Sequence, residues 1–207
     1  MIDEQKAAAN RAARMERKRA HLRAVYDRQL ARLRELEGQD PLTTARNTNA
    51  AMDGLLAADR VNNPFAAGIR CAKGCSHCCN GPVEIGPHES ALLIEALRSA
   101  GRSLDEQRLE RQSGYSVATW RKQPPADRAC VFLGEGGACT VYDSRPGACR
   151  KLLVLSDPAF CDAGNGAMDQ IDRWFSWEAE MMASAALELF GVDLMPRALL
   201  AASRRSK

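Results

Sequence analysis

The sequence predicts a mainly α protein with a small β-hairpin, and three observations lead to this fold class. The 207-residue chain contains 34 Ala but only 18 Val, Ile and Thr together, a bias that favours helix over strand. Apolar residues recur at helical spacing in several segments, the first of them over residues 3–37. Two short β-prone runs, 130–133 and 139–142, flank the Gly-rich segment 134–137 and predict a hairpin.

The first element, residues 1–38, is predicted to be a long basic amphipathic helix that ends at a Gly cap. Its apolar face consists of five residues at steps of four and three: Leu22, Tyr26, Leu30, Leu33 and Leu36. Residues 1–37 carry ten basic and six acidic side chains, a net charge of +4, whereas the rest of the chain carries −1. Because the segment before Leu22 is mostly Ala and Arg, it is expected to project into solvent.

This helix has two interpretations. It binds a protein partner or a second copy of itself, or it packs as a solvated amphipathic helix on its own domain. Nucleic acid is not an expected partner, because acidic residues are interleaved with the basic ones and no aromatic residues accompany them.

The rest of the chain divides into three predicted parts: a helix and linker over 39–68, a cysteine-cluster domain over 69–161, and C-terminal helices over 162–207 packed on the same domain. In the first part, Asp40 and Pro41 have the pattern of a helix start, and the helix is expected to reach Ala58.

Four further helices are expected from apolar spacing and end signals. One runs over 87–99. Another begins at a capping box formed by Ser103 and Glu106 and ends near Trp120. A long helix is expected over 168–189, and a short helix from Pro196 leads to a loose tail over 204–207.

The composition limits the class of protein. Apolar residues make up 45% and charged residues 27% of the chain, a balance that excludes a wholly disordered protein. No apolar run approaches the ~20 residues that span a bilayer, so no membrane span is expected. No secretory signal is visible, so a cytoplasmic location is expected, where thiols stay reduced. Structural disulfides are the alternative reading of an even number of cysteines.

The cysteines are the main functional signal, because all eight fall in two groups beside Gly, Pro, Ser and Asn rather than on apolar faces. They are Cys71, Cys75, Cys78 and Cys79, followed by Cys130, Cys139, Cys149 and Cys161. The two-residue gap between Cys75 and Cys78 lets a tight turn aim both sulfur atoms at one metal. The adjacent Cys78 and Cys79 are expected to diverge. A hairpin with Val131 opposite Ala138 would place Cys130 across from Cys139.

A thiolate-rich site suits zinc or an iron–sulfur cluster and disfavours magnesium or calcium. Nearby cations should offset the thiolate charge, and four flank the cysteines: Lys73, Arg145, Arg150 and Lys151. Arg145 is expected to contact a thiolate or a carbonyl of the hairpin. His77 could replace a sulfur ligand or be a solvated loop residue, and His88 is read as a helix-start residue.

The spacing of Cys71, Cys75 and Cys78 also matches the three-cysteine motif of radical-SAM enzymes. Those enzymes place the motif after the first strand of an α/β barrel. Here it follows Asn-Asn-Pro, and the downstream pattern is helical. The spacing nevertheless keeps a [4Fe–4S] cluster open as an alternative to zinc.

The full pattern resembles the bacterial YkgJ-like family of cysteine-cluster proteins, whose domain is described as zinc- or iron-chelating. The resemblance covers about residues 69–161 and includes all eight cysteines together with three residues of the second half: Tyr142, Arg145 and Pro146. It implies a compact cysteine-rich core around a metal centre, with the eight cysteines as ligands.

The resemblance leaves the biochemical role open among three classes. One is a metal-binding protein in storage, delivery or sensing. Another is an iron–sulfur enzyme in SAM-linked protein methylation. This class is suggested by analogy with flagellin lysine methylase, a relative that carries a similar cysteine module. The third is an adaptor in which metal stabilises the fold and the N-terminal helix binds the partner. No catalytic residue is predicted, and the chain has no Gly-x-Gly-x-x-Gly motif after a strand.

Overall fold

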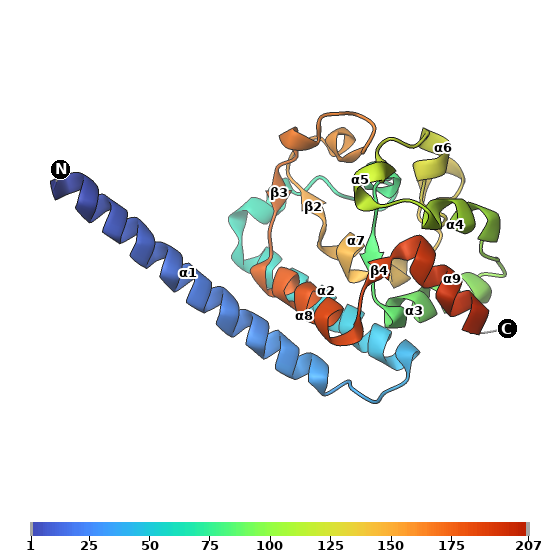
Figure 1. Cartoon of the computed structure of the whole chain (residues 1–207), viewed down its shortest axis with the longest axis horizontal. Coiled ribbons are helices and arrows are strands. Elements are labelled where there is room, and N and C mark those ends of the chain that lie inside the picture. The colour runs from blue at the N-terminus through green and yellow to red at the C-terminus, as the bar shows by residue number, and fades with distance from the viewer. Residues whose placement is uncertain (1, 206–207) are drawn as a thin grey trace.

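The computed structural model describes residues 2–205, and helices make up most of this part of the chain (Figure 1), which confirms the predicted mainly α class. The α-helices are α1 (Ile2–Arg34), α2 (Pro41–Asn62), α3 (Pro87–Ser99), α4 (Glu106–Ser113), α5 (Val117–Trp120), α6 (Pro125–Arg128), α7 (Gly147–Lys151), α8 (Trp177–Phe190) and α9 (Met195–Arg205). Six single-turn 3₁₀ helices join them: η1 (Pro64–Gly68), η2 (His77–Asn80), η3 (Glu135–Gly137), η4 (Tyr142–Ser144), η5 (Pro158–Cys161) and η6 (Met168–Gln170).

The β structure consists of two short antiparallel pairs. The strands are β1 (Glu84–Ile85), β2 (Leu153–Val154), β3 (Arg173–Trp174) and β4 (Asp193–Leu194). β1 pairs with β4, and β2 pairs with β3, with Leu153 opposite Trp174. Both pairs therefore join segments that are separated along the chain, and they fix the C-terminal part against the segments that flank the cysteines.

The loop predicted as the hairpin has a different register from the one expected. A single β-bridge places Leu133 opposite Cys139, and the backbone N–H of Thr140 donates to the carbonyl of Phe132 at 2.8 Å. Cys130 is consequently not opposite Cys139. Two Gly residues with positive φ, Gly136 at 72° and Gly137 at 78°, allow a tight turn. The paired residues therefore lie closer to the tip of the loop than expected.

α1 confirms the predicted N-terminal helix, although it ends at Arg34 and not at the predicted cap Gly38, and it divides into two parts. Val25 and Leu33 are buried where the helix packs against α8. The residues from 8 to 21 are all exposed, and this half of α1 extends beyond the rest of the molecule (Figure 1). The expected projection into solvent is therefore present.

α2 begins as predicted, because the Asp40 side chain accepts hydrogen bonds from the backbone N–H groups of Leu42 and Thr43 at 3.0 Å. The helix continues to Asn62, four residues beyond the predicted end at Ala58. Asn63 then begins η1, where its side chain accepts from the N–H of Phe65 at 3.0 Å.

Two predicted helices are shorter than expected. The predicted helix that ends near Trp120 is split into α4 and α5, and Asp105 rather than Ser103 caps α4. The predicted helix over 168–189 begins only at Trp177, because Arg173 and Trp174 pair with β2 and the Ser176 hydroxyl caps the N–H of Ala179. Strand pairing and a capping hydroxyl thus override the helical spacing.

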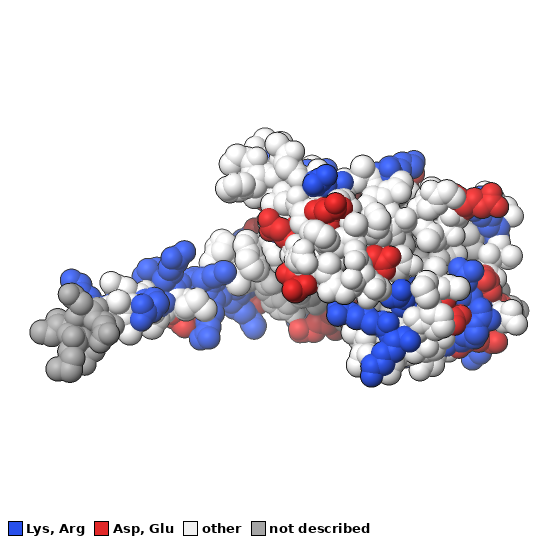
Figure 2. All heavy atoms as spheres, turned by 90° about the horizontal axis from the view of Figure 1, so that it is seen from above, with Lys and Arg blue, Asp and Glu red and all other residues white. Residues whose placement is uncertain are grey.

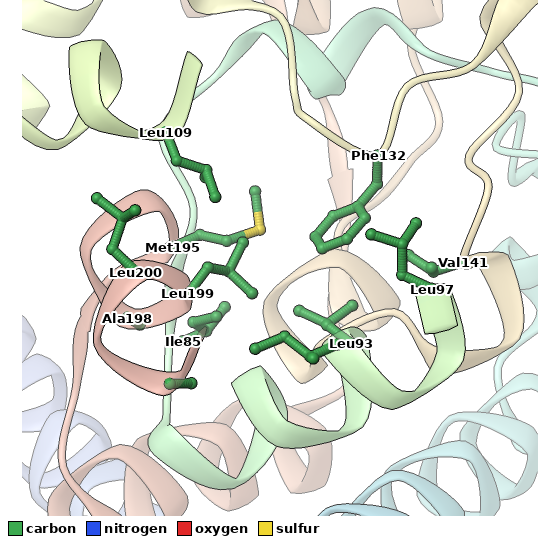
Figure 3. Close-up of a cluster of buried hydrophobic side chains, with 12 residues drawn as sticks. Ile85, Leu93, Leu97, Leu109, Phe132, Val141, Met195, Ala198, Leu199 and Leu200 are labelled. Carbon is green, nitrogen blue, oxygen red and sulfur yellow. The ribbon is translucent and has the colours of Figure 1, made fainter. Parts of the chain in front are cut away.

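Two apolar clusters form the core. The first, shown in Figure 3, lies among α3, α4 and α9 and is built around Leu93, Leu109 and Leu199, all fully buried. The second joins α1, α2 and α8, with Leu33 and Met182 fully buried. Cysteines pack against both clusters: Cys130 and Cys139 against the first, and Cys71 against the second.

The predicted C-terminal helices occupy both clusters, with α8 in the second and α9 in the first. The expected tail begins inside α9, which continues to Arg205, and its last two residues lie outside the described part of the chain. Within residues 2–205, no helix has the length and apolar character needed to cross a membrane.

Candidate metal centre

The first cysteine group lies on a loop that turns tightly before η2. Gly74 has a φ of 97°, a conformation that favours Gly, and the N–H of Cys75 donates to the carbonyl of Ala72 at 3.1 Å. The sulfur of Cys71 accepts a hydrogen bond from the N–H of Val154 at 3.3 Å. This bond fixes the start of the loop to β2.

The second group reaches the same region from three other segments. The N–H of Cys130 donates to the carbonyl of Cys79 at 2.8 Å, which brings the two groups into direct contact. Cys149 lies in α7, and Cys161 is the last residue of η5. The side-chain amide of Asn80 lies 3.4 Å from the carboxylate of Asp162, so η5 is held beside η2.

Cys78 interacts electrostatically with most of the other thiols. Burial is the main cause that raises the pKa of five other cysteines, and the charge of Cys78 raises each of them further: Cys71, Cys130, Cys139, Cys149 and Cys161. The sixth neighbour is Cys79, whose thiol forms a hydrogen bond with Cys78. The adjacent thiols of Cys78 and Cys79 therefore interact, and the expected divergence does not separate them.

The environment disfavours free thiolates. Burial raises the pKa of Cys130 and Cys149 to about 12, and that of Cys161 to about 11. For Cys78, the hydrogen bond with Cys79 and then burial raise the pKa strongly. These thiols stay protonated at neutral pH unless a cation compensates their charge, and a metal ion does so directly.

Arg145 supplies the positive charge that reaches most of these thiols. Its charge partly offsets the raised pKa of four cysteines: Cys71, Cys78, Cys139 and Cys149. The guanidinium stacks 3.6 Å from the centroid of the Tyr142 ring, and its Nε donates to the carbonyl of Tyr142 at 3.0 Å. The contact with a carbonyl of the predicted hairpin segment is thus present.

The other three flanking cations have different partners. Lys73 lies 5.4 Å from the centroid of the Tyr142 ring. Lys151 Nζ lies 2.6 Å from Glu180. Arg150 is buried, donates to the carbonyl of Arg145 at 2.7 Å and pairs with Asp53 at 2.6 Å, so it holds the loop that carries Arg145.

The two histidines near the cysteines differ in burial. His77 is exposed, which agrees with a solvated loop residue. His88 is buried in the first turn of α3, as expected for a helix-start residue, and both of its ring nitrogens lack a hydrogen-bond partner among the described residues.

Sequence analysis did not assign a role to Glu89, which positions one of the cysteines. Its buried carboxylate accepts hydrogen bonds from the N–H of Gly86 at 2.8 Å and from the N–H of Gly147 at 2.7 Å. Gly147 begins α7, which carries Cys149. The capping-box position of Glu89 at the start of α3 is a sequence signal for its bond with Gly86. No such signal predicts its bond with Gly147.

The donor set fits a soft metal ion or an iron–sulfur cluster, because eight thiols lie in one electrostatically connected group. All eight are free cysteines, so the disulfide alternative is not supported. Within the described part of the chain, no group of three or more His, Cys, Asp or Glu side chains is already closed around a metal position.

The thiols line two cavities. One, about 470 Å³, is lined by Cys71, Cys75 and Arg145 among other polar residues. The other, about 570 Å³, is largely apolar and is lined by Cys161. Cys78 and Cys149 line both cavities.

These features define a cysteine-rich metal-binding domain, and the comparison with known families agrees. Residues 70–169 match the family model "CxxCxxCC: Putative zinc- or iron-chelating domain". The segment that contains all eight cysteines therefore matches this family, as the resemblance in the sequence predicted. No curated protein and no solved structure matches the chain.

Proposed function

We propose that the protein binds zinc or iron through all eight cysteines and that the metal stabilises the fold. The ligands would be Cys71, Cys75, Cys78, Cys79, Cys130, Cys139, Cys149 and Cys161. The observation that supports this proposal is that both halves of the cysteine pattern meet: Cys78 and Cys149 line the same two cavities, and the N–H of Cys130 donates to the carbonyl of Cys79 at 2.8 Å. In the cytoplasm, such a centre would suit metal storage, delivery or sensing.

The structural role follows from where the cysteines lie. They occur on loops and single-turn helices that connect the two apolar clusters, and short elements of this kind have little stability of their own. A metal that binds four or more of these sulfur atoms would cross-link the segments. The cross-links would supply the stability that these short elements lack. Removal of metal should therefore unfold the region over 70–161, as in other metal-dependent domains.

The first test is the metal and acid-labile sulfide content of the full chain purified without oxygen, with its visible spectrum. A colourless protein with zinc and no sulfide would identify a zinc centre. A brown protein with iron and sulfide would identify an iron–sulfur cluster and favour the enzyme related to flagellin lysine methylase. Protein that contains neither metal under these conditions, and takes up neither on reconstitution, would contradict the proposal.

A variant tests the role of Cys78 in metal binding. We expect Cys78→Ser to lose most of the bound metal, because it removes the thiol that lines both cavities together with four other cysteines: Cys71, Cys75, Cys149 and Cys161. Ser76→Ala, two residues away, is the matched control and should retain the metal. Circular dichroism and thermal melting after chelation test the structural role separately, and unchanged melting of metal-free protein would exclude it.

The exposed part of α1 supports a second candidate function, that of an adaptor. Residues 6–23, called here the basic arm, contain seven Lys or Arg and one Glu, and nearly all of them are exposed. Figure 2 shows these basic side chains gathered along the arm, outside the body of the protein. A helix of this charge would bind an acidic protein surface.

Charge reversal tests the adaptor function. The triple variant Arg11→Glu, Arg14→Glu and Arg17→Glu leaves the buried part of α1 intact, and the corresponding triple Lys variant keeps the charge. An adaptor should lose its partner in the first variant and keep it in the second, as measured by quantitative pull-down and by light scattering for self-association. Equal behaviour of both variants would contradict the adaptor function.

A further inference from the structure

The larger apolar cavity lies beside the proposed metal centre, and most of its lining residues are not among the proposed metal ligands. Its volume of about 570 Å³ lies within the range of roughly 300–1,000 Å³ that is typical of small-molecule sites. Cys78, Cys149 and Cys161 form one part of its wall. A molecule in this cavity would therefore lie directly against the cysteine cluster.

The rest of the wall is mainly aliphatic and is built from separate segments of the chain. Val83 precedes β1, Val117 begins α5, Ile171 precedes β3 and Leu187 lies on α8. Val117 remains 53% exposed, so its apolar surface is available to a ligand. Burial of such surface against an aliphatic chain is favourable.

Positive charge lines the same cavity. Lys151 and Arg173 both line it, and both pair with the single carboxylate of Glu180, at 2.6 and 2.8 Å. One acidic group thus serves two cations. Arg121, a third lining cation, is exposed, and its side chain forms no hydrogen bond or ion pair with any residue from 2 to 205. Among the described lining residues, Glu84 alone is acidic.

We propose that this cavity binds a small monocarboxylic acid with an aliphatic chain. The carboxylate would lie toward Arg121, and the chain would lie along Val117 and Leu187, with the cysteine cluster at the inner wall. The aliphatic lining explains the preference for an apolar chain, and the excess of cations over acidic groups explains the preference for an anion. The proposal adds a ligand to the metal centre proposed above and does not depend on which metal is bound.

Hexanoate is the probe for the direct test, by isothermal titration calorimetry on the full chain as purified with its metal. Hexan-1-ol has the same chain without the charge, and acetate has the charge without the chain. We expect saturable one-to-one binding of hexanoate, with binding of both controls weaker by about tenfold or more. Absence of saturable hexanoate binding, or equal affinity for hexan-1-ol, would overturn the proposal.

A pair of variants at Val117 locates the site. Val117→Glu introduces a negative charge into the wall, and Val117→Lys introduces a positive charge on a side chain of similar length; both substitutions are on an exposed residue at a helix start. We expect the Glu variant to weaken hexanoate binding about tenfold and the Lys variant to preserve it. Arg121→Gln should also weaken hexanoate binding. Unchanged affinity in Val117→Glu would place binding elsewhere and overturn the proposal.

Metal analysis of each titrated sample separates this proposal from the metal-binding function. Samples that retain metal but do not bind hexanoate would overturn the ligand proposal alone. Samples that bind hexanoate but take up no metal would contradict the metal-binding function and support the cavity as an independent site.

Discussion

The carboxylate of Glu89 accepts a hydrogen bond from the backbone N–H of Gly147 at 2.7 Å and thereby ties α3 to the helix that carries Cys149. The same carboxylate accepts the N–H of Gly86 at 2.8 Å. Glu89 is 7% exposed, so neither N–H would regain a full water partner if the side chain were removed.

We expect Glu89→Ala to lower the free energy of unfolding by about 2–3 kcal/mol, because two buried N–H groups lose a charged acceptor. It should also lower the metal affinity, since Cys149 loses its support. Urea unfolding and a chelator competition measure the two effects. Glu110→Ala, an exposed glutamate on α4, is the control and should change stability by less than about 0.5 kcal/mol. Equal stability of the two variants would contradict this role of Glu89.

Arg145 should contribute to metal affinity through its charge. Its guanidinium partly offsets the raised pKa of four thiols, after the larger effects of burial and of the hydrogen bond between Cys78 and Cys79. We expect Arg145→Met to lower the metal affinity about 10–100-fold and Arg145→Lys to restore part of it. Competition with a chelator of known affinity is the measurement.

Arg60→Gln is the matched control for the Arg145 variants. Arg60 lines the cavity of about 470 Å³ together with Arg145, but it is not among the charges that shift the pKa of these four thiols. Its loss should leave the metal affinity nearly unchanged. An equal effect of both substitutions would show that general positive charge, rather than the position of Arg145, supports the centre.

The sequence predicted the elements whose signals are local. Asp40 before Pro41 identified the start of α2, and the apolar face with Leu33 identified the packed part of α1. These predictions were correct because a cap and a helical face depend on residues within a few turns. The segment 168–173 was predicted as helix and is partly strand, because its pairing partner, Val154, lies far away in the chain.

The candidate site divides in the same way. The cysteine spacing predicted the family, since the two-residue gap between Cys75 and Cys78 is a local feature. The meeting of Cys78 with Cys149 at the same cavities could not be predicted, because it arises when segments from both halves come together in three dimensions. The predicted hairpin register was wrong because two Gly residues allow a tight turn. The β-bridge therefore forms closer to the tip of the loop than the β-prone runs suggested.

The division of α1 into a packed part and a basic arm predicts unequal effects of truncation. Leu33 is fully buried against α8, whereas Met15 on the basic arm is 53% exposed. We expect Leu33→Ala to cost about 2–5 kcal/mol, through lost burial and a cavity, and Met15→Ala to cost less than about 0.5 kcal/mol. Urea unfolding of both variants measures the difference, and a comparable loss for Met15→Ala would mean that the arm is packed in solution.

His88 predicts a pH dependence of stability that is separate from the metal centre. It is 4% exposed, both ring nitrogens lack a partner among the described residues, and burial lowers its pKa to about 4. An unfolded histidine has a pKa of about 6.5, so between these values the unfolded state binds more protons than the folded state. The wild type should therefore lose stability as the pH falls from about 6.5 toward 4, by up to about 3 kcal/mol.

We expect His88→Phe to remove this loss, because the phenyl ring has no proton to bind and can pack against Phe190, whose ring centroid lies 4.7 Å from that of His88. The variant should be more stable than the wild type, and its advantage should grow between pH 7.5 and pH 5.5. Metal release at low pH affects both proteins equally, so the difference in unfolding free energy isolates His88. His21→Ala, on the exposed part of α1, is the control and should show no such growth. An advantage of His88→Phe that does not change with pH would show that the buried imidazole does not control acid stability.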